Sequence, residues 1–249
     1  NGGLYSEKVY SLTVIDKNDA PTGLSISAST VQENAEAEVI GSFTATDQDA
    51  SDSHTYKLIE GEGDESNDLF SINSSGQLVT SSTLNFESSS SHSIRVIATD
   101  AAGASFQKVF TVTVTDENDA PSAIKLSARS VLENLTAGVE VGSILVTDED
   151  ATDTHTLSFV TGTGDTDNAS FEISGTKLLA QNSFDYETQN SYSVRLKAVD
   201  GQGESVESIL IITVLNDNDE PSAISLSANK INENSSVDSA IGSFQVTDQ

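Results

Sequence analysis

The sequence predicts an all-β fold made of tandem antiparallel sandwiches stacked end to end, and three observations support this. The 249 residues repeat with a spacing of 100, because the acidic segments 16–21, 116–121 and 216–221 share one pattern. About seven short stretches of alternating or β-branched residues per 100 residues are separated by Gly, Asn, Asp and Ser. Helical periodicity is almost absent.

The repeat divides the chain into two complete modules, 22–121 and 122–221, each the size of a small domain. Residues 1–21 are expected to be the C-terminal hairpin and linker of an upstream repeat. Residues 222–249 are expected to begin a downstream repeat. The two fragments cannot make one module, since neither contains a stretch that matches 150–200. We therefore expect the chain to be a segment of a longer array.

The strands of the first module are each predicted from a local pattern. The alternation from Phe110 to Thr115 has period two and leads directly into the acidic linker, as 209–214 does in the second module. Because only a Pro separates each linker from the next module, the modules should form a rod. The predicted strands are 24–26, 40–46, 54–59, 69–72, 77–80, 93–99 and 105–115.

The charge of the chain limits its partners. Thirty-nine acidic and 11 basic residues give a net charge of −28. Nucleic acid and anionic membranes are poor partners for a surface of this charge, and we expect no nucleic-acid partner. A disordered acidic tail does not fit a hydrophobic content of 36% in strand-like patterns. Acidic residues at fixed positions of a repeat indicate a bound cation instead.

Cysteine and membrane signals are both absent from the sequence. There is no Cys, so neither disulfides nor thiols indicate a compartment. No apolar run approaches the ~18 residues that a membrane-spanning helix needs, and we expect no membrane insertion of this segment. A long extracellular β chain without disulfides needs another source of rigidity, and bound metal could supply it.

The residue types at the repeated linkers favour calcium among the metals. Clusters of Asp, Glu and Asn offer oxygen only, and Ca²⁺ takes six to eight oxygen ligands. Zinc and copper are poor candidates, because the chain has three His and no Cys. An EF-hand does not fit 148–153, which lacks the glycine that its loop needs at the sixth position.

Five short motifs recur in the same order and register: Glu33-Asn34, Asn85-Phe86-Glu87, the linker 116–119, Asp148-Glu149-Asp150 and Ala198-Val199-Asp200. In this order they resemble the cadherin repeat family, and they look closest to the cadherin-like repeats of large bacterial surface proteins. The resemblance covers essentially the whole chain. It implies Greek-key sandwiches of the cadherin or immunoglobulin-like type, with up to about three Ca²⁺ at each joint between repeats.

The resemblance also implies a ligand set for each joint. The first complete joint would use Glu33, Glu87, Asp116, the Glu117 carbonyl, Asn118, Asp119, Asp148, Asp150 and Asp200. The next joint would use Glu133, Asp185, Glu187, Asp217, Asn218, Asp219 and Asp248. The joint before the first module would use Asp16, Asn18, Asp19, Asp47, Asp49 and Asp100.

The sequence departs from the animal cadherin pattern in three places. Each linker is one residue shorter before its Pro. Asn85 stands where an Asp is expected, and Asn216 replaces the Asp that opens the linker. We expect unequal ion counts or affinities between joints as a result. Asp52 and Asp153, just beyond the Asp-x-Asp pairs, are marginal ligand candidates.

Other functions are less consistent with the repeat. Asp185 and Glu187 resemble the carboxylate pair of a glycosidase, but an enzyme needs one dedicated cleft, and here every module has the same acids. A turn-forming acidic surface explains one linker, yet not the recurrence of Glu33, Glu87 and Asp100 with it. The absence of Trp and the recurrence of aromatics within strand patterns favour core packing over sugar binding.

We therefore expect a calcium-rigidified stalk of a large bacterial extracellular adhesin, and no enzyme. The expected partners are the neighbouring repeats of the same chain. Two alternatives stay open: a module that binds surface glycans in a calcium-dependent way, and a homophilic module that binds like repeats on another cell.

Overall fold

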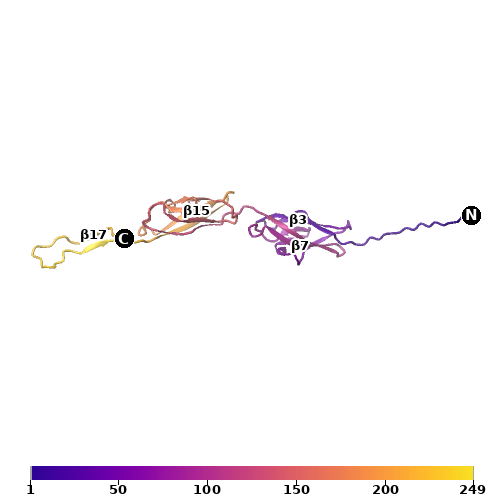
Figure 1. Cartoon of the computed structure of the whole chain (residues 1–249), viewed down its shortest axis with the longest axis horizontal. Coiled ribbons are helices and arrows are strands. Elements are labelled where there is room, and N and C mark those ends of the chain that lie inside the picture. Colours follow the sequence, from indigo (N-terminus) through magenta and orange to yellow (C-terminus); the bar gives the residue numbers. More distant parts are fainter. Residues whose placement is uncertain (1, 249) are drawn as a thin grey trace. The chain divides into compact units, whose positions relative to one another are not determined.

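The computed structural model describes residues 2–248, which form two compact units, 2–117 and 118–248 (Figure 1). Each unit contains a sandwich of two four-stranded sheets. Residues 1 and 249, at the outer ends of the two expected fragments, lie outside the described range. The all-β class expected from the sequence is confirmed, whereas the end-to-end stacking of the units stays a prediction.

In the first unit one sheet has the order β1-β3-β6-β5 and the other β2-β8-β7-β4. A 3₁₀ turn, η1 (Asn67–Leu69), precedes β5. The strands are β1 (Gly23–Ile26), β2 (Thr30–Gln32), β3 (Val39–Thr46), β4 (Thr55–Leu58), β5 (Phe70–Ile72), β6 (Gln77–Thr80), β7 (Ser91–Thr99) and β8 (Ser105–Thr115).

The second unit repeats this topology, with sheets β13-β14-β11-β9 and β10-β16-β15-β12. Its 3₁₀ turn is η2 (Asn168–Ser170). The strands are β9 (Ala123–Leu126), β10 (Ser130–Leu132), β11 (Glu140–Thr147), β12 (Thr156–Phe159), β13 (Phe171–Ser174), β14 (Lys177–Ala180), β15 (Ser191–Val199) and β16 (Ser205–Leu215).

All seven strands predicted for the first module are present, but β2 and its counterpart β10 were not predicted. Both strands have three residues with a single buried side chain, Val31 or Val131, so they carry no alternating pattern. The sheets are antiparallel, as expected, except where β2 pairs with β8 in parallel, and β10 with β16. After β1 the chain crosses to the other sheet, where β2 pairs with β8, the last strand of the unit. The two strands run in the same direction and therefore form a parallel pair.

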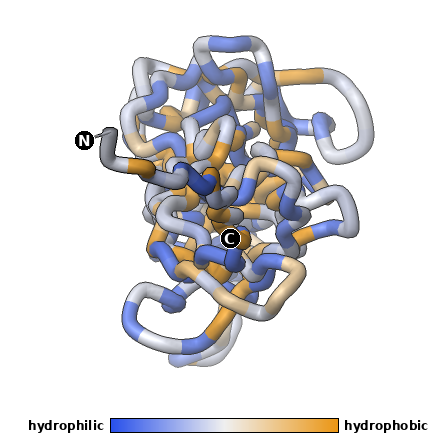
Figure 2. Tube along the Cα trace, turned by 90° about the vertical axis from the view of Figure 1, so that its right-hand side faces the viewer, coloured by the Kyte–Doolittle hydropathy of each residue, from blue (hydrophilic) through white to orange (hydrophobic). Residues whose placement is uncertain are grey.

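Alternating burial along the central strands builds each core. In β7, Ile94, Val96 and Ala98 are fully buried and the residues between them are partly exposed. Figure 2 shows hydrophobic and hydrophilic residues interspersed along the chain trace. The recurring aromatics Phe70 and Phe171 are also buried. The core-packing role expected for these two residues is therefore confirmed.

A glycine is required at one repeated position of β3 and β11. The strand register shifts next to Gly41 and again next to Gly142. A Cβ atom at Gly142 would lie 2.7 Å from the Ala128 carbonyl oxygen, closer than real Cβ atoms approach backbone. The glycine therefore allows one backbone segment to pass directly over another.

We expect Gly142→Ala to lower the free energy of unfolding of the second unit by about 1–3 kcal/mol, the usual cost of overpacking. Chemical denaturation followed by circular dichroism would measure this. Gly201→Ala is the control, because nothing lies within 4 Å of a Cβ built there. Equal midpoints for the two variants would contradict the role given to Gly142.

The ends of the chain have less regular structure. No strand occurs within residues 2–22, and β17 (Ala223–Leu226) pairs with β18 (Phe244–Thr247) as an isolated hairpin. A two-stranded hairpin without a sheet to pack on is marginal. The assignment of 1–21 and 222–249 to neighbouring repeats stays a prediction. Within residues 2–248, no helix is long and apolar enough to cross a membrane.

Candidate metal centre

Each unit has two groups of acidic and amide side chains, one formed around the linker that precedes it and one around the linker that follows. The head cluster consists of Asn18, Asp19, Asp47, Asp49 and Asp100 in the first unit, and of Asn118, Asp119, Asp148, Asp150 and Asp200 in the second. The tail cluster consists of Glu33, Glu87, Asp116 and Glu117 in the first unit, and of Glu133, Asp185, Glu187, Asp217 and Asp219 in the second.

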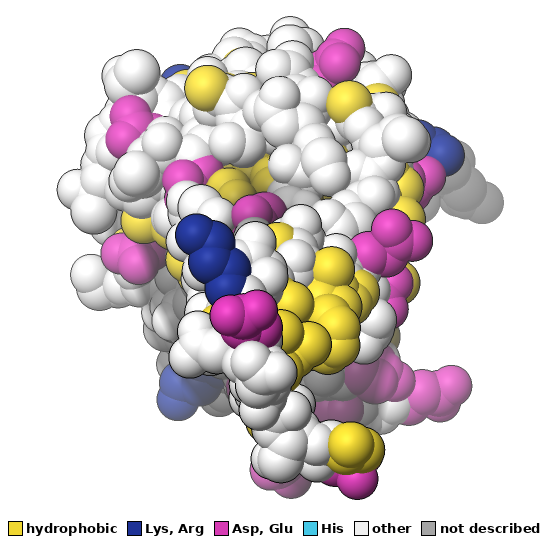
Figure 3. All heavy atoms as spheres, turned by 90° about the vertical axis from the view of Figure 1, so that its left-hand side faces the viewer, with side chains coloured by type: hydrophobic (Ala, Val, Ile, Leu, Met, Phe, Trp, Pro, Cys, Tyr) yellow, Lys and Arg dark blue, Asp and Glu magenta, His cyan; other side chains and the backbone are white. Residues whose placement is uncertain are grey.

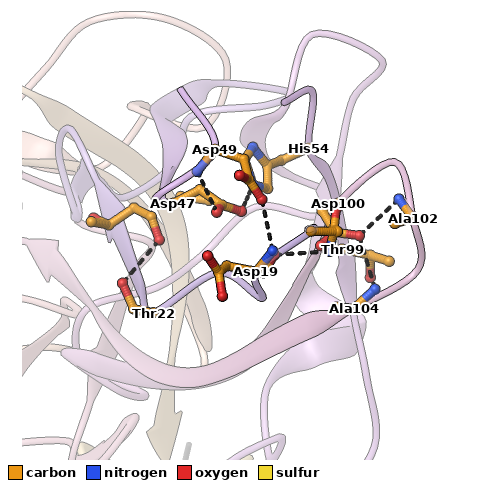
Figure 4. Close-up of polar contacts among 12 residues, drawn as sticks. Asp19, Thr22, Asp47, Asp49, His54, Thr99, Asp100, Ala102 and Ala104 are labelled. Atoms are coloured by element: carbon orange, nitrogen blue, oxygen red, sulfur yellow. Dashed lines mark hydrogen bonds and ion pairs between the residues drawn. The ribbon is translucent and has the colours of Figure 1, made fainter. Parts of the chain in front are cut away.

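The head cluster of the first unit is held together by hydrogen bonds (Figure 4). The backbone N–H of Asp19 donates to Asp49 Oδ2 at 2.7 Å, and the Asp49 N–H donates to Asp47 Oδ1 at 3.1 Å. His54 Nε2 lies 2.9 Å from Asp47 Oδ2. This histidine therefore makes a hydrogen bond within the cluster. The segment before β1 is thus tied to the loop after β3.

Asp100 connects the same cluster to the end of β7. Its Oδ2 accepts a hydrogen bond of 3.1 Å from the Asn18 side-chain amide. Its Oδ1 accepts the backbone N–H groups of Ala102 and Ala104 at 2.9 and 2.8 Å, which shapes the turn into β8. The side chain is 94% buried, so Asp100 is a core component of the cluster rather than a surface charge.

The head cluster of the second unit repeats this arrangement, although the two loops differ in sequence. The same residue types therefore make the same contacts in both units. The corresponding distances are 2.7 Å from Asp119 N to Asp150 Oδ2, 3.0 Å from Asn118 Nδ2 to Asp200 Oδ2, and 2.6 Å from His155 Nε2 to Asp148 Oδ2.

These hydrogen bonds keep part of the head cluster ionised. The bond from His54 lowers the pKa of Asp47. The bond from Asn18 lowers the pKa of Asp100. Burial opposes the charge of Asp200, but the bonds from Asn118 and from the backbone of the following turn lower its pKa overall. Carboxylates that stay charged while buried are suitable cation ligands.

A buried glutamate organises each tail cluster. Glu33 follows β2 and is 97% buried. Its Oε2 accepts the Phe86 N–H at 2.7 Å, and its Oε1 accepts the Glu117 N–H at 2.9 Å. The next residue, Asn34, has a φ of 59°, a left-handed turn that Asn tolerates. The Glu-Asn motif therefore combines a buried carboxylate with the turn that directs it inward.

Glu133 organises the tail cluster of the second unit in the same way. Its carboxylate accepts the backbone N–H groups of Tyr186 and Asp217 at 2.7 and 2.8 Å. Carboxylate oxygens of Glu133, Asp185 and Glu187 all lie within 4.8 Å of one another. Burial, followed by the charges of these neighbours and Asp219, raises the pKa of Glu187. Without a cation, this tail cluster is therefore a site of like-charge repulsion.

The tail cluster of the first unit has the same character. Carboxylate oxygens of Glu33 and Glu87 lie within 4.8 Å of one another, and so do those of Glu87 and Asp116. The Gln32 side-chain amide donates to Glu117. Neither Lys nor Arg belongs to either tail cluster. On the face drawn in Figure 3, acidic side chains are spread over the surface and basic ones are few.

The clusters suit a hard divalent cation because their donor sets offer oxygen and because some oxygens in or beside the head clusters lack hydrogen-bond partners. Asp52 Oδ2, Asn118 Oδ1 and Asp153 Oδ2 are buried and make no hydrogen bond with any of residues 2–248. Leaving buried oxygens unpaired is costly, and a cation satisfies them. Ca²⁺ accepts such sets of carboxylate and amide oxygens, whereas zinc prefers Cys and His.

Three predicted ligands lie outside the head and tail clusters as defined above. Asp16 accepts the N–H of its neighbour Lys17. The Asn218 amide donates to the Asp219 carbonyl at 2.9 Å. Asp248 is exposed after β18. Their ligand roles stay predictions, as do those of the residues within the clusters.

Sequence reasoning missed two contacts of the second tail cluster. The Asn134 side chain donates to Asp219 Oδ1 at 2.8 Å, and that of Asn216 donates to Glu187 Oε1 at 2.8 Å. The recurrence of Glu-Asn indicated that the Asn matters, but the identity of its partner depends on the fold. The Asn216 contact shows how this departure from the linker pattern is accommodated.

The Gly-rich loops after β4 and β12 are turns. Asp64 Oδ2 accepts the Gly61 N–H at 2.9 Å, and Asp165 Oδ2 accepts the Gly162 N–H at the same distance. Gly61 has a φ of 137°, which favours glycine. Both segments are therefore turns that an aspartate side chain closes.

Known proteins share both the sequence pattern and the fold. The family model described as Cadherin domain matches residues 27–117 and 127–215. Protocadherin Fat 4 of mouse is 32% identical over 249 residues, covering 95% of this chain and 5% of the relative. Human Protocadherin-1 is 32% identical over 243 residues, covering 92% of this chain and 22% of the relative. The chain thus spans a small part of both relatives.

Solved structures agree on the fold. The crystal structure of human Protocadherin-24 EC1-2 (Form II) superposes with a TM-score of 0.58 at 22% identity, covering 76% of this chain and 94% of that one. The extracellular cadherin domains 1-4 of Protocadherin Gamma B7 give a TM-score of 0.56 at 21% identity, covering 92% and 59%. With both sandwiches matched by the family model, this chain belongs to the cadherin domain family.

Proposed function

We propose that this chain is a calcium-rigidified extender segment of a large extracellular adhesion protein. Cadherin domains are extracellular adhesion modules that bind calcium at the junctions between repeats. The observation that carries the proposal for this chain is the presence, in both units, of buried acidic clusters with unpaired oxygens around the linker residues. These clusters lie at positions that repeat between the two units.

The linker residues belong to these clusters through specific contacts. The backbone N–H of Glu117 is bound by Glu33 in the first unit. The side chain of the next residue, Asn118, is bound to Asp200 in the second. Because these two linker residues are adjacent in the chain, a cation held by either cluster would restrict the same short segment. We infer up to about three ions per joint, held by the ligand sets assigned above.

The mechanism is mechanical. Without Ca²⁺, carboxylates within a few ångströms repel one another, and the linker gains freedom to bend. With Ca²⁺, the same carboxylates share a cation, and the angle between repeats becomes fixed. The segment then acts as a spacer that carries a distal binding domain away from the cell. Its partners in this role are the neighbouring repeats of its own chain.

The more specific expectations from the sequence remain proposals. A bacterial surface adhesin remains our proposal for the parent protein, although the two relatives named above are from mouse and human. Glycan binding gains no support from the recurring aromatics, since Phe70 and Phe171 are buried. Homophilic association would appear as concentration-dependent oligomers in the experiment below.

Small-angle X-ray scattering of this chain, titrated with Ca²⁺ and then with chelator, tests the proposal. We expect the maximum dimension and the stiffness of the chain to increase when Ca²⁺ is added. Both should return to their starting values when chelator is added. Unchanged dimensions across the titration would show that the acids are a surface feature or that packing alone fixes the joints. A dilution series at each calcium concentration separates stiffening from association.

Glu87→Ala should reduce the calcium-dependent stiffening at the first complete joint, because it removes an exposed carboxylate that lies within 4.8 Å of both Glu33 and Asp116. The matched control is Glu172→Ala, which removes an exposed Glu of β13 in the second unit. If the scattering of Glu87→Ala followed that of the control, Glu87 would not be a ligand.

A further inference from the structure

We propose that Asp52 and Asp153 each supply an additional carboxylate ligand to the cation of their head cluster, and that His54 and His155 are the residues that position Asp47 and Asp148 for it. This inference rests on the proposed calcium function. It goes beyond the cadherin motifs, which provide Asp47, Asp49 and Asp100 but assign nothing to the aspartate and histidine that follow.

A tight turn brings Asp52 back to the cluster. The Asp52 N–H donates to the Asp49 carbonyl at 3.0 Å, and the Asp153 N–H donates to the Asp150 carbonyl at the same distance. As a result, carboxylate oxygens of Asp47, Asp52 and Asp100 lie within 4.8 Å of one another. Three carboxylates at this spacing can contact a single Ca²⁺, whose oxygen ligands lie about 2.3–2.6 Å away.

One carboxylate oxygen of this aspartate lacks a hydrogen-bond partner in both units. Asp52 Oδ2 and Asp153 Oδ2 are buried, and neither makes a hydrogen bond with any residue in the described range 2–248. An aspartate that serves only as a turn former uses its side chain to accept a nearby backbone N–H. Here the turn is closed by backbone atoms, and the carboxylate oxygen is left without a donor. A cation ligand explains this arrangement.

The histidines fix the orientation of the first aspartate of each pair. The His155 and Asp148 side chains are 14% and 5% exposed, and Nε2 lies 2.6 Å from Oδ2. Asp148 Oδ1 accepts the Asp150 N–H at 3.3 Å. With both oxygens engaged, the carboxylate cannot rotate away from the cluster. Hydrogen-bonded partners that orient metal ligands commonly change metal affinity about 10–100-fold when removed.

The test is calorimetric titration of the whole 249-residue chain with Ca²⁺, combined with thermal unfolding in chelator. Asp153→Asn should weaken one class of Ca²⁺ sites about tenfold or more relative to the wild type. The control is Glu172→Gln, which makes the same charge change at an exposed position of the same unit. It should change the Ca²⁺ affinity by less than about threefold. In chelator, the Asp153→Asn variant should melt at or above the wild-type temperature, because like-charge repulsion is relieved.

Two outcomes would overturn the assignment while leaving the proposed function intact. One is a wild type that binds Ca²⁺ together with an Asp153→Asn variant that binds as the control does. The other is an Asp153→Asn variant that melts below the wild type in chelator, which indicates a structural role. A wild type that binds no Ca²⁺ would overturn the proposed function and this inference together.

For the histidine, His155→Gln keeps a side-chain N–H donor and His155→Phe removes it. We expect the Gln variant to bind Ca²⁺ within about threefold of the wild type and the Phe variant about tenfold more weakly. Equal affinities for the two variants would refute the positioning role, because a residue needed only for packing would not depend on the donor.

Discussion

Replacing Glu133 by Gln is expected to lower the free energy of unfolding of the second unit by about 2–4 kcal/mol when calcium is chelated. The Glu133 side chain is 98% buried, and each of its oxygens accepts one backbone N–H, from Tyr186 and from Asp217. Gln replaces one acceptor by an NH₂ group, which then faces a donor. One charged hydrogen bond is lost and a buried N–H is left unpaired.

Hydrogen exchange followed by mass spectrometry would assign this loss to its unit. Amides of the second unit should lose protection, while those of the first unit keep it. Glu172→Gln, with the same change at an exposed position, should stay within about 0.5 kcal/mol of the wild type. Unaltered protection in Glu133→Gln would mean that the two backbone contacts contribute little, and that Glu133 is buried for another reason.

The same glutamate illustrates what the sequence could and could not predict. The recurrence of Glu33 and Glu133 with the acidic linkers predicts them as cation ligands, and the structure places both of them in tail clusters, while the ligand role itself stays a prediction. Their burial was not evident, because a lone Glu between a three-residue strand and an Asn gives no hydrophobic pattern. The short strands β2 and β10, which directly precede these residues, were missed for the same reason.

The head clusters show a similar division. Asp47, Asp49 and Asp100 were predicted from the repeat, and the structure brings them together. Their hydrogen bonds connect residues that are up to 82 positions apart, as between Asn18 and Asp100. Such pairings depend on which strands become neighbours. The partner of His54 and the unpaired oxygen of Asp52 could therefore be found only once the fold was known.

Addition of Ca²⁺ to about 10 mM is expected to raise the unfolding temperature by about 5–20 °C relative to chelator. Extracellular modules commonly have dissociation constants of about 10⁻⁴–10⁻³ M. A Ca²⁺ concentration of 10 mM is then about 10–100 times the dissociation constant. This excess stabilises the folded, calcium-bound state by about 1.4–2.7 kcal/mol per site. For a unit of about 100 residues, each kcal/mol shifts the midpoint by about 4–8 °C. Differential scanning calorimetry measures the shift directly.

Sodium chloride at matched ionic strength separates ligation from general screening of the net charge of −28. The Debye length is about 10 Å at 0.1 M salt. The carboxylate oxygens of Glu133, Asp185 and Glu187 lie within 4.8 Å of one another, well inside this length. Monovalent salt should therefore leave their repulsion largely in place, whereas a divalent ion bound among them removes it. An equal rise in melting temperature with NaCl would show that the acidic clusters respond to ionic strength alone, and the calcium assignment would be wrong.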